Sequence, residues 1–365
     1  MKKWMFLAVA SVFAFASCSN EEDPVVQPEV ENGSVVFQLS AVNQLTDGLS
    51  SRVTNAPVYS QEATQNVSNV MIYAFLQSGS DYVFSKSYNV TNWIVGGTTA
   101  RYAIPDNNML AMGNYRFLVV GRDASDNYTV TTPVAGTTSY SAMVASISAP
   151  GQETEIFAGS TDAAITDQGV RVSVQMTRVV AGVLGYFKNV PQQLNGSTVQ
   201  FLRLSISNSD TQVGLYSGMG SNPTNTAYNI INIDLSGQSV TGTGVFSGNT
   251  VPANVSKVPN SQLSGSYYLP VGSIAMTLGL YDAGGNMIKQ WPVVNESNAT
   301  TFDISANNFY SLGMKKVAAT TDGGTPADPS DDDNPIDLLL DQNITITINP
   351  AWATIHNLGL GSNNP

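Results

Sequence analysis

The sequence predicts an all-β protein that is built from two tandem β-sandwich domains. Short runs rich in β-branched and aromatic residues recur along the chain, and Gly, Asn, Asp, Ser or Pro separates them, which is typical of sandwiches. After residue 17 no stretch has the i, i+3, i+4, i+7 apolar spacing of an amphipathic helix. The 365 residues are enough for about two domains of ordinary size.

The composition indicates an exported protein without a nucleic-acid partner. Hydrophobic residues make up 42% of the chain, so it can bury substantial cores. Charged residues make up only 12%, against a usual share of about 25%. The formal net charge is −12, whereas phosphate binding needs clustered Lys and Arg. After the N-terminal segment no apolar run reaches the length of a membrane-spanning helix.

Residues 1–17 have the pattern of a signal peptide. Two lysines precede an apolar run over residues 4–16, which is too short to span a membrane. The only cysteine, Cys18, follows at once. An ordinary cleaved signal would leave this thiol unpaired in an oxidising compartment. We therefore expect lipidation of Cys18 by acyl chains such as palmitate, and anchoring in a membrane, although Phe15 is atypical of such a site.

Residues 18–33 form an acidic tether, since they carry several Glu, one Asp and two Pro without a core of their own. The N-terminal sandwich domain is expected over residues 34–168. Its strands are predicted at residues 34–42, 69–76, 81–90 and 115–121.

One arginine stands alone in this region. Arg52 is the only basic residue between Lys3 and Lys86, and it lies in a loop of small polar residues. Such loops are favoured sites of proteolysis. An Arg-specific protease would cut between Arg52 and Val53 and detach residues 34–52 with the first strand. The alternative is an ordinary exposed arginine, and the residues alone do not decide between the two.

The boundary between the domains is expected at the turn-rich residues 161–169, and the C-terminal sandwich domain over residues 169–319. We predict its strands at residues 171–187, 199–207, 228–236, 266–271, 273–282 and 308–317.

Residues 320–335 form an acidic, Pro-containing linker. A Ca²⁺ site at Asp331, Asp332 and Asp333 is one interpretation of it. The linker lacks the glycine at position six and the distal glutamate of a twelve-residue Ca²⁺ loop. A solvated loop is therefore favoured, and no metal is expected.

Residues 336–365 form a C-terminal appendage with a regular strand pattern. Ile344, Ile346 and Ile348 alternate with polar residues, and Trp352 follows. If proteolysis removed the first strand, it would leave a groove with unpaired backbone groups. The C-terminal strand of another copy could fill that groove by donor-strand exchange. A head-to-tail contact of this kind builds a filament.

The residue types of the common catalytic sites are scarce. The chain has one histidine, His356, and one cysteine, so a catalytic triad or a zinc site lacks its members. A glycosidase would need only two carboxylates, but the strands offer no obvious pair. No catalytic residue and no cofactor is therefore expected. Trp93, Trp291 and Trp352 could stack on glycans, although packing in the interior is favoured.

The order of these features resembles the fimbrillins, the major pilin type of Bacteroidales. The resemblance rests first on the signal peptide that ends at Cys18 and on Arg52, which precedes the predicted strand "NVMIYAFL". It also rests on the segments "GNYRFLVVG" and "VRVSVQMTRVVAGV" and on the tail "NITITINPAW". The acidic tether is also similar to signals that send lipoproteins of Bacteroidales to the outer face of the outer membrane. The resemblance implies transthyretin-like Greek-key sandwiches and cleavage at the cell surface after Arg52. It also implies polymerisation with other copies and related pilins.

The leading hypothesis is a structural pilin, in a stalk role, that supports adhesion. The family resemblance implies that stalk subunits have both a cleavable arginine and a donor appendage, whereas anchors keep the N-terminal strand. The alternative is a monomeric cell-surface lipoprotein that binds glycan or a host protein.

Overall fold

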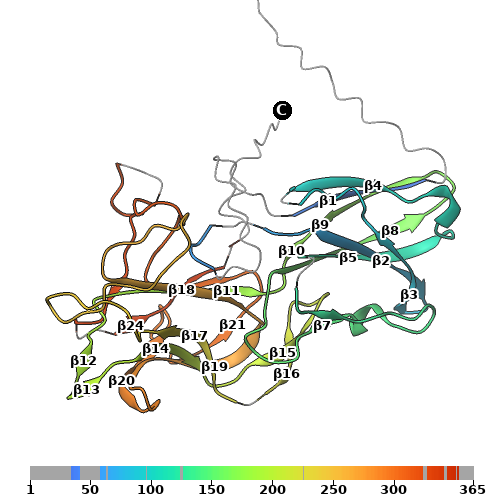
Figure 1. The fold of residues 1–365 in the computed structure, drawn as a ribbon. Coiled ribbons are helices and arrows are strands. Elements are labelled where there is room, and N and C mark those ends of the chain that lie inside the picture. Colours follow the sequence, from blue (N-terminus) through green and yellow to red (C-terminus); the bar gives the residue numbers. More distant parts are fainter. Residues whose placement is uncertain are drawn as a thin grey trace, which may run out of the picture.

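The computed structural model describes residues 34–41, 58–62, 65–95, 97–123, 126–224, 226–323, 327–340, 343–350 and 352. These residues form strands joined by turns and loops, together with two short 3₁₀ helices, η1 (Asp106–Asn108) and η2 (Tyr140–Ala142). None of the helices in the described part of the chain is long and apolar enough to cross a bilayer. The prediction of an all-β protein is confirmed (Figure 1).

Two sheets face each other in the part of the molecule that holds the start of the described chain. The β1 sheet has the order β4 (Thr99–Ala103), β1 (Val35–Ser40), β9 (Val170–Gln175). The β5 sheet has the order β10 (Thr177–Arg178), β8 (Ile156–Ile165), β5 (Gly113–Arg122), β2 (Asn69–Ser78), β3 (Asp81–Asn89). Apolar side chains from β1, β9, β2 and β5 form one buried cluster between them.

A second pair of sheets encloses another buried cluster (Figure 1). The β11 sheet has the order β18 (Ser261–Tyr268), β11 (Ala181–Lys188), β22 (Phe309–Leu312), β25 (Thr347–Asn349), and β23 (Ile336–Asp337) also pairs with β11. The β19 sheet has the order β17 (Tyr228–Asp234), β14 (Phe201–Ile206), β19 (Val271–Tyr281), β20 (Met287–Val294), β24 (Ile344–Thr345), and β21 (Thr301–Ile304) also pairs with β19. A small hairpin joins β12 (Gln193–Leu194) to β13 (Ser197–Thr198).

The β15 sheet connects the two parts. Its order is β16 (Gly220–Pro223), β15 (Asp210–Gly214), β7 (Val144–Ser146), β6 (Thr129–Val130). Phe75 and Leu118 of the β5 sheet share a buried cluster with Met143 and Leu215 beside the β15 sheet. The β5 sheet is therefore covered on both faces, which explains why β2 and β5 have nearly continuous apolar runs.

Three sequence predictions need correction. The single strand predicted at residues 171–187 is wrong, because β9, β10 and β11 lie in three different sheets. The strand predicted at 308–317 ends at Leu312, before Gly313 with its φ of +83°. The stretch 161–169 is not turn-rich throughout, since β8 continues to Ile165. The strands β9 and β10, which follow the predicted domain boundary, pair with β1 and β8, which precede it.

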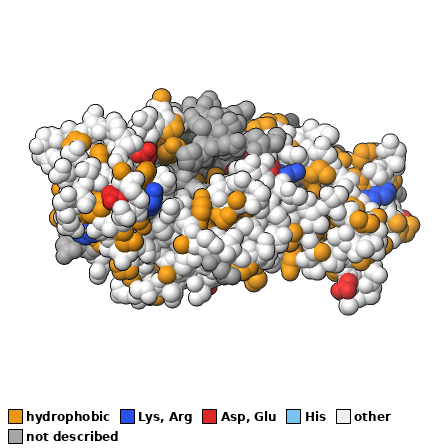
Figure 2. Space-filling model, turned by 60° about the horizontal axis from the view of Figure 1, so that its bottom comes forward, with side chains coloured by type: hydrophobic (Ala, Val, Ile, Leu, Met, Phe, Trp, Pro, Cys, Tyr) orange, Lys and Arg blue, Asp and Glu red, His pale blue; other side chains and the backbone are white. Residues whose placement is uncertain are grey.

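The surface carries few charges. Figure 2 shows Lys, Arg, Asp and Glu side chains scattered singly over one face, as expected from a chain with 12% charged residues.

One buried carboxyl lies where the loop before β8 meets the second part of the chain. Glu153 is 9% exposed, and its Oε2 accepts a hydrogen bond from the Gly151 N–H at 2.6 Å. Burial raises the pKa of Glu153 from 4.5 to about 7, against the effect of this hydrogen bond. The carboxyl charge also raises the pKa values of Tyr128, Tyr228 and Tyr268. Glu153 is therefore a buried group that titrates near neutral pH.

This group predicts a pH dependence of stability. The folded pKa lies above the unfolded value, so the contribution of Glu153 is complete below pH 4.5 and is lost as the pH rises through about 7. We expect the free energy of unfolding to fall by about 2–3 kcal/mol more in the wild type than in Glu153→Gln between pH of about 5 and about 8. Urea unfolding across this range measures the difference. The control is Asp106→Asn at an exposed position, and an unchanged pH slope in Glu153→Gln would contradict the assignment.

Candidate functional site

β1 is the central strand of its sheet and pairs along both edges. It runs antiparallel to β4, with Val36 opposite Ala103, and parallel to β9, with Val35 opposite Val170. Both neighbours come from distant parts of the sequence. Each would have an unpaired edge without β1.

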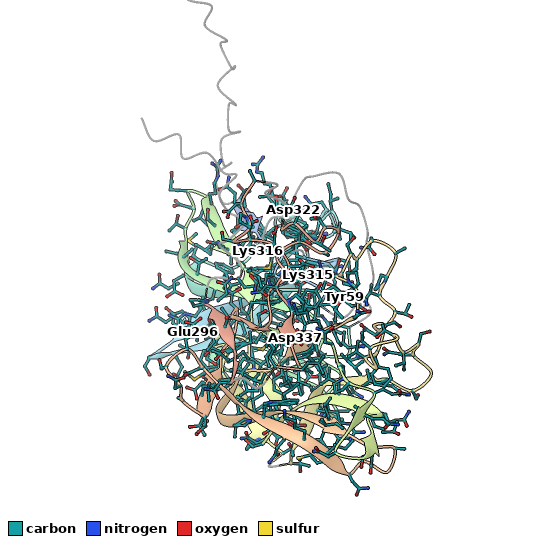
Figure 3. All side chains as sticks on the ribbon, turned by 90° about the vertical axis from the view of Figure 1, so that its left-hand side faces the viewer. Tyr59, Glu296, Lys315, Lys316, Asp322 and Asp337 are labelled. Atoms are coloured by element: carbon teal, nitrogen blue, oxygen red, sulfur yellow. The ribbon has the colours of Figure 1, made fainter. Side chains whose placement is uncertain are left out.

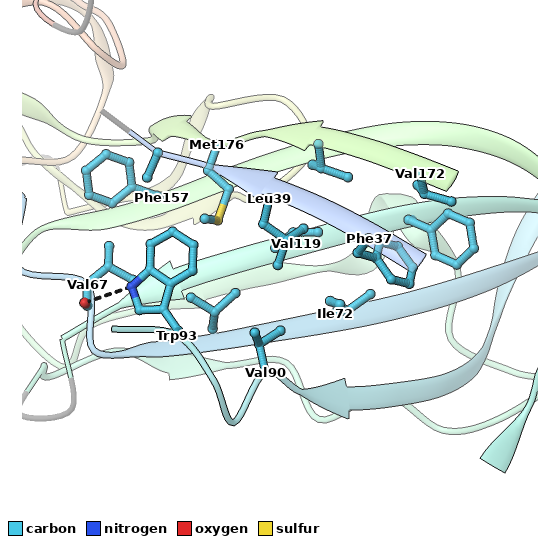
Figure 4. Packing of buried hydrophobic residues seen from close by; sticks show 14 of the residues in the cluster. Phe37, Leu39, Val67, Ile72, Val90, Trp93, Val119, Phe157, Val172 and Met176 are labelled. Carbon is cyan, nitrogen blue, oxygen red and sulfur yellow. Dashed lines mark hydrogen bonds between the residues drawn. The ribbon is translucent and has the colours of Figure 1, made fainter. Parts of the chain in front are cut away.

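The apolar face of β1 fills the core between the β1 and β5 sheets. Phe37 is 0% exposed and Leu39 is 1% exposed, which confirms the predicted inward face. The Phe37 ring meets the Phe117 ring edge-on, with 5.0 Å between centroids. Figure 4 shows both β1 side chains packed among Val119 and Val172. Each buried side chain of this size contributes roughly 1.5–3 kcal/mol, so the core requires a strand in this position.

The segments on either side of β1 bear on the predicted processing. Cys18, Arg52 and Val53 lie outside the described residues. After the predicted cleavage site, the next described segment is residues 58–62, which is attached to the second part of the chain. The Gln61 N–H donates to the Lys315 carbonyl at 2.9 Å, and the Ala318 N–H donates to Glu62 Oε2 at 2.6 Å.

The C-terminal tail is folded onto its own chain. The predicted single strand over residues 343–350 is wrong, because β24 belongs to the β19 sheet and β25 to the β11 sheet. The chain crosses between the sheets at Ile346, whose N–H donates to the Val294 carbonyl at 2.8 Å. Ile344 and Ile346 are buried in their own chain, and Ile348 is half-buried. Both short strands lie at sheet edges.

An open groove of about 820 Å³ lies beside this tail. Phe309 and Ser311 of β22 line one side, Ile336 of β23 contributes another part, and Thr347 and Ile348 of the tail line the rest. The packing along this edge of the tail is therefore incomplete.

Trp352 packs against side chains of both parts of the fold. Its side chain is 1% exposed and contacts the rings of Phe309 and Tyr267, with centroids 5.1 Å and 5.9 Å away. The Arg178 guanidinium lies over the indole at 4.1 Å, a favourable cation–π geometry. Trp352 and Phe37 belong to the same buried cluster. The structure thus brings the tail and β1 into one core.

Arg178 is held by a buried ion pair. Its Nε donates to Glu155 Oε1 at 2.6 Å, and both side chains are almost completely buried. The Asn66 N–H donates to the other carboxylate oxygen at 2.9 Å. Burial raises the pKa of Glu155, while Arg178 lowers it. Sequence reasoning missed this pair, although an arginine inside the apolar run "VQMTRVVAGV" is an indication of a buried charge.

The other two tryptophans also lie in the interior. Trp93 is buried and donates its Nε1–H to the Val67 carbonyl at 3.1 Å (Figure 4). Trp291 is buried as well. The interpretation that all three tryptophans serve packing is confirmed, and none of them offers an exposed platform for a glycan.

The aspartates of the linker are not equivalent. Asp333 pairs with Lys315 at 2.9 Å, with both side chains 0% exposed, and also accepts a hydrogen bond from the Tyr186 hydroxyl. Burial raises the pKa of Asp333 and Lys315 lowers it. Asp331 and Asp332 instead lie beside Asp322. The sequence-based grouping of Asp331, Asp332 and Asp333 is therefore wrong, because Asp333 forms an ion pair with Lys315 instead. The sequence did not indicate that this lysine is buried.

Comparison with known proteins points to fimbrial subunits. A sequence model of the fimbrillin-A associated anchor proteins Mfa1 and Mfa2 matches residues 48–357. Among solved structures, the chain is 12% identical to the fimbrial anchor protein Mfa2 from Porphyromonas gingivalis, covering 76% of this chain and 90% of that chain at a TM-score of 0.43. It is 13% identical to a fimbrilin (fimA) from Porphyromonas gingivalis W83, covering 88% and 98% at a TM-score of 0.39. No curated protein matches the chain.

Because Trp352 is buried, we predict that its side chain holds the tail against the rest of the fold. In Trp352→Ala the lost packing weakens the closed tail by about 3–5 kcal/mol, as for other buried tryptophans. We expect the Ile346 amide to exchange its hydrogen much faster, while the β5 amides keep their protection. Hydrogen exchange measured by NMR or mass spectrometry tests this, and Trp352→Phe serves as the milder control. Unchanged exchange at Ile346 would show that the tail does not depend on this side chain.

Proposed function

The chain belongs to the family of fimbrillin-A associated anchor proteins Mfa1 and Mfa2, and from this premise we propose that it is a structural subunit of a cell-surface fimbrium. It is exported as a precursor with a lipidated Cys18 and is tethered to the outer membrane. An Arg-specific protease then cuts between Arg52 and Val53. The subunit assembles with further copies or with related subunits and supports adhesion.

The observation that carries this proposal is the position of β1. This strand is buried and paired on both edges, and Arg52 follows it in the sequence, before the next described segment at residues 58–62. A cut after Arg52 would separate β1 covalently from all the later strands. The groove that remains has backbone donors and acceptors on both sides, and these require a replacement strand.

The tail has the properties of a strand that can be donated. In its own chain it pairs over only two residues in β24 and three in β25. β1, by comparison, is six residues long and is paired on both edges. A tail that replaces β1 in a neighbouring subunit would gain a longer ladder of backbone hydrogen bonds, each worth about 0.5–1.5 kcal/mol. We therefore expect the exchange to lower the free energy once β1 has left the groove.

We favour a stalk role, because the chain combines Arg52 with a tail of the donor type. The family description favours one second candidate, an anchor that keeps β1 throughout. Cleavage separates the two roles, because a stalk subunit has to lose β1 and an anchor does not.

Cleavage of the purified precursor tests the proposal. We expect an Arg-specific protease to yield a chain that begins at Val53 and forms ladders resistant to SDS. Arg52→Lys keeps the charge but is not cut by such a protease, so it stays monomeric. Arg101→Lys, at an exposed arginine of β4, is the matched control and polymerises like the wild type.

The products are identified by N-terminal sequencing and gel electrophoresis. A chain that begins at Val53 but remains monomeric, with its tail still protected, would contradict the pilin assignment. A precursor that is not cut at Arg52 would favour the anchor role.

Removal of the tail gives a second prediction. Because β24 and β25 are edge strands, a chain without residues 343–365 should keep its other sheets. It should accept a donor strand but provide none, and therefore shorten fibres when it is mixed with wild-type subunits. Electron microscopy of fibre length measures this capping. Fibres of unchanged length with the truncated chain incorporated would show that the donor lies elsewhere.

A further inference from the structure

Three carboxylates of the acidic linker converge on one point. Asp322, Asp331 and Asp332 each place a carboxylate oxygen so that all three oxygens lie within 4.8 Å of one another. The two ends of the loop are held together by the backbone, since the Asp333 N–H donates to the Thr321 carbonyl at 3.1 Å. The cluster therefore joins the start of the loop to its end.

The carboxylates are partly withdrawn from water and lack partners. Asp331 is only 8% exposed, and its Oδ1 is buried without a hydrogen bond from any described residue. The Oδ1 of Asp322 is buried and unpartnered in the same way. A buried acceptor without a donor loses its hydrogen bonds to water without replacement, and the cost is larger when the group is charged. This cost indicates that a ligand belongs in the cluster.

The nearby lysine does not neutralise these charges. The Lys315 ammonium binds Asp333 and the Thr320 carbonyl, both at 2.9 Å. In the described part of the chain, no Lys, Arg or His nitrogen lies within 4.0 Å of the three carboxylates. Figure 3 shows Asp322, Lys315 and Lys316 in the same region as Tyr59, from the segment that follows the predicted cleavage site.

The ligand set favours a calcium ion. Ca²⁺ takes six to eight oxygen ligands and tolerates irregular geometry, so three carboxylates from one loop can share it with water. Mg²⁺ requires a nearly ideal octahedron and usually takes only one or two carboxylates. Carboxylates are also the ligands that Ca²⁺ prefers.

We propose that Asp322, Asp331 and Asp332 form a Ca²⁺ site that closes the acidic linker. Water completes the coordination of the ion. The bound ion ties residue 322 to residues 331 and 332, immediately before β23 and the tail. This inference is independent of the proposed fimbrial function, because it concerns only metal binding to the precursor.

Calorimetric titration and thermal unfolding of the full chain test the site. After treatment with EDTA, we expect CaCl₂ to bind with a Kd of about 10⁻⁴–10⁻³ M, the range of extracellular calcium modules, and to raise the melting temperature. Asp331→Asn should weaken binding by about tenfold or more, because it removes one charged ligand. Asp328→Asn is the matched control, since it makes the same change at an exposed position of the same loop.

The melting temperatures of the wild type and of Asp331→Asn, compared in EDTA and in excess CaCl₂, give a second test of the site. In EDTA, Asp331→Asn should melt above the wild type, because it removes one of three mutually repelling charges. In excess CaCl₂ it should melt below the wild type. The proposal is overturned if the wild type shows neither heat nor a shift at about 10 mM CaCl₂, or if Asp331→Asn binds as well as the wild type. An equal shift with MgCl₂ would overturn the assignment to calcium.

Discussion

A strand in the middle of a sheet needs hydrogen-bond partners on both edges, and this constraint determines how the first part of the molecule is built. β1 provides hydrogen-bond partners for the backbone groups on the facing edges of both β4 and β9. Its side chains complete the core against the β5 sheet. Buried backbone groups that lose their partners are costly. The position of β1 therefore has to be filled by a strand for the edges of β4 and β9 and the core to be complete.

The contact between Arg178 and Trp352 links this position to the other end of the chain. A buried ion pair is expensive to assemble, yet Arg178 and Glu155 are held in place by β10 and by the Asn66 N–H. The guanidinium face is thereby presented to the indole. β10 directly follows β9, the strand beside β1. Only these two short elements therefore separate β1 from the arginine that supports Trp352.

The sequence predicted strands well where their residues determined the structure locally. The strands β2, β3, β5 and β19 begin and end within about two residues of their predicted limits, because apolar runs between turn residues mark them. β8 was missed, since its small residues "AGSTDAA" form an alternating and partly exposed strand.

The errors have a common cause in pairing between distant segments. The crossings at residues 176 and 179–180 and at Ile346 could not be predicted, because the hydrophobic pattern is the same on both sides of each crossing. The inward face of β1 was correct, whereas the sequence did not show that Asp333 lies apart from Asp331 and Asp332 and pairs with the buried Lys315. The alternation of polar and apolar residues determines which face of a strand is buried, but it does not determine which sheet the strand joins.

The parallel pairing of β1 with β9 has a consequence for the order in which the molecule folds. Residues 35–40 emerge early during synthesis, but one of their two partners is at residues 170–175. Contacts over such a separation form slowly, because a long loop must be closed first. Until then "VVFQLS" is an uncharged, β-prone segment of the kind that aggregates. Glu29 and Glu31 lie shortly before this segment in the sequence, and charges beside such a segment oppose its aggregation.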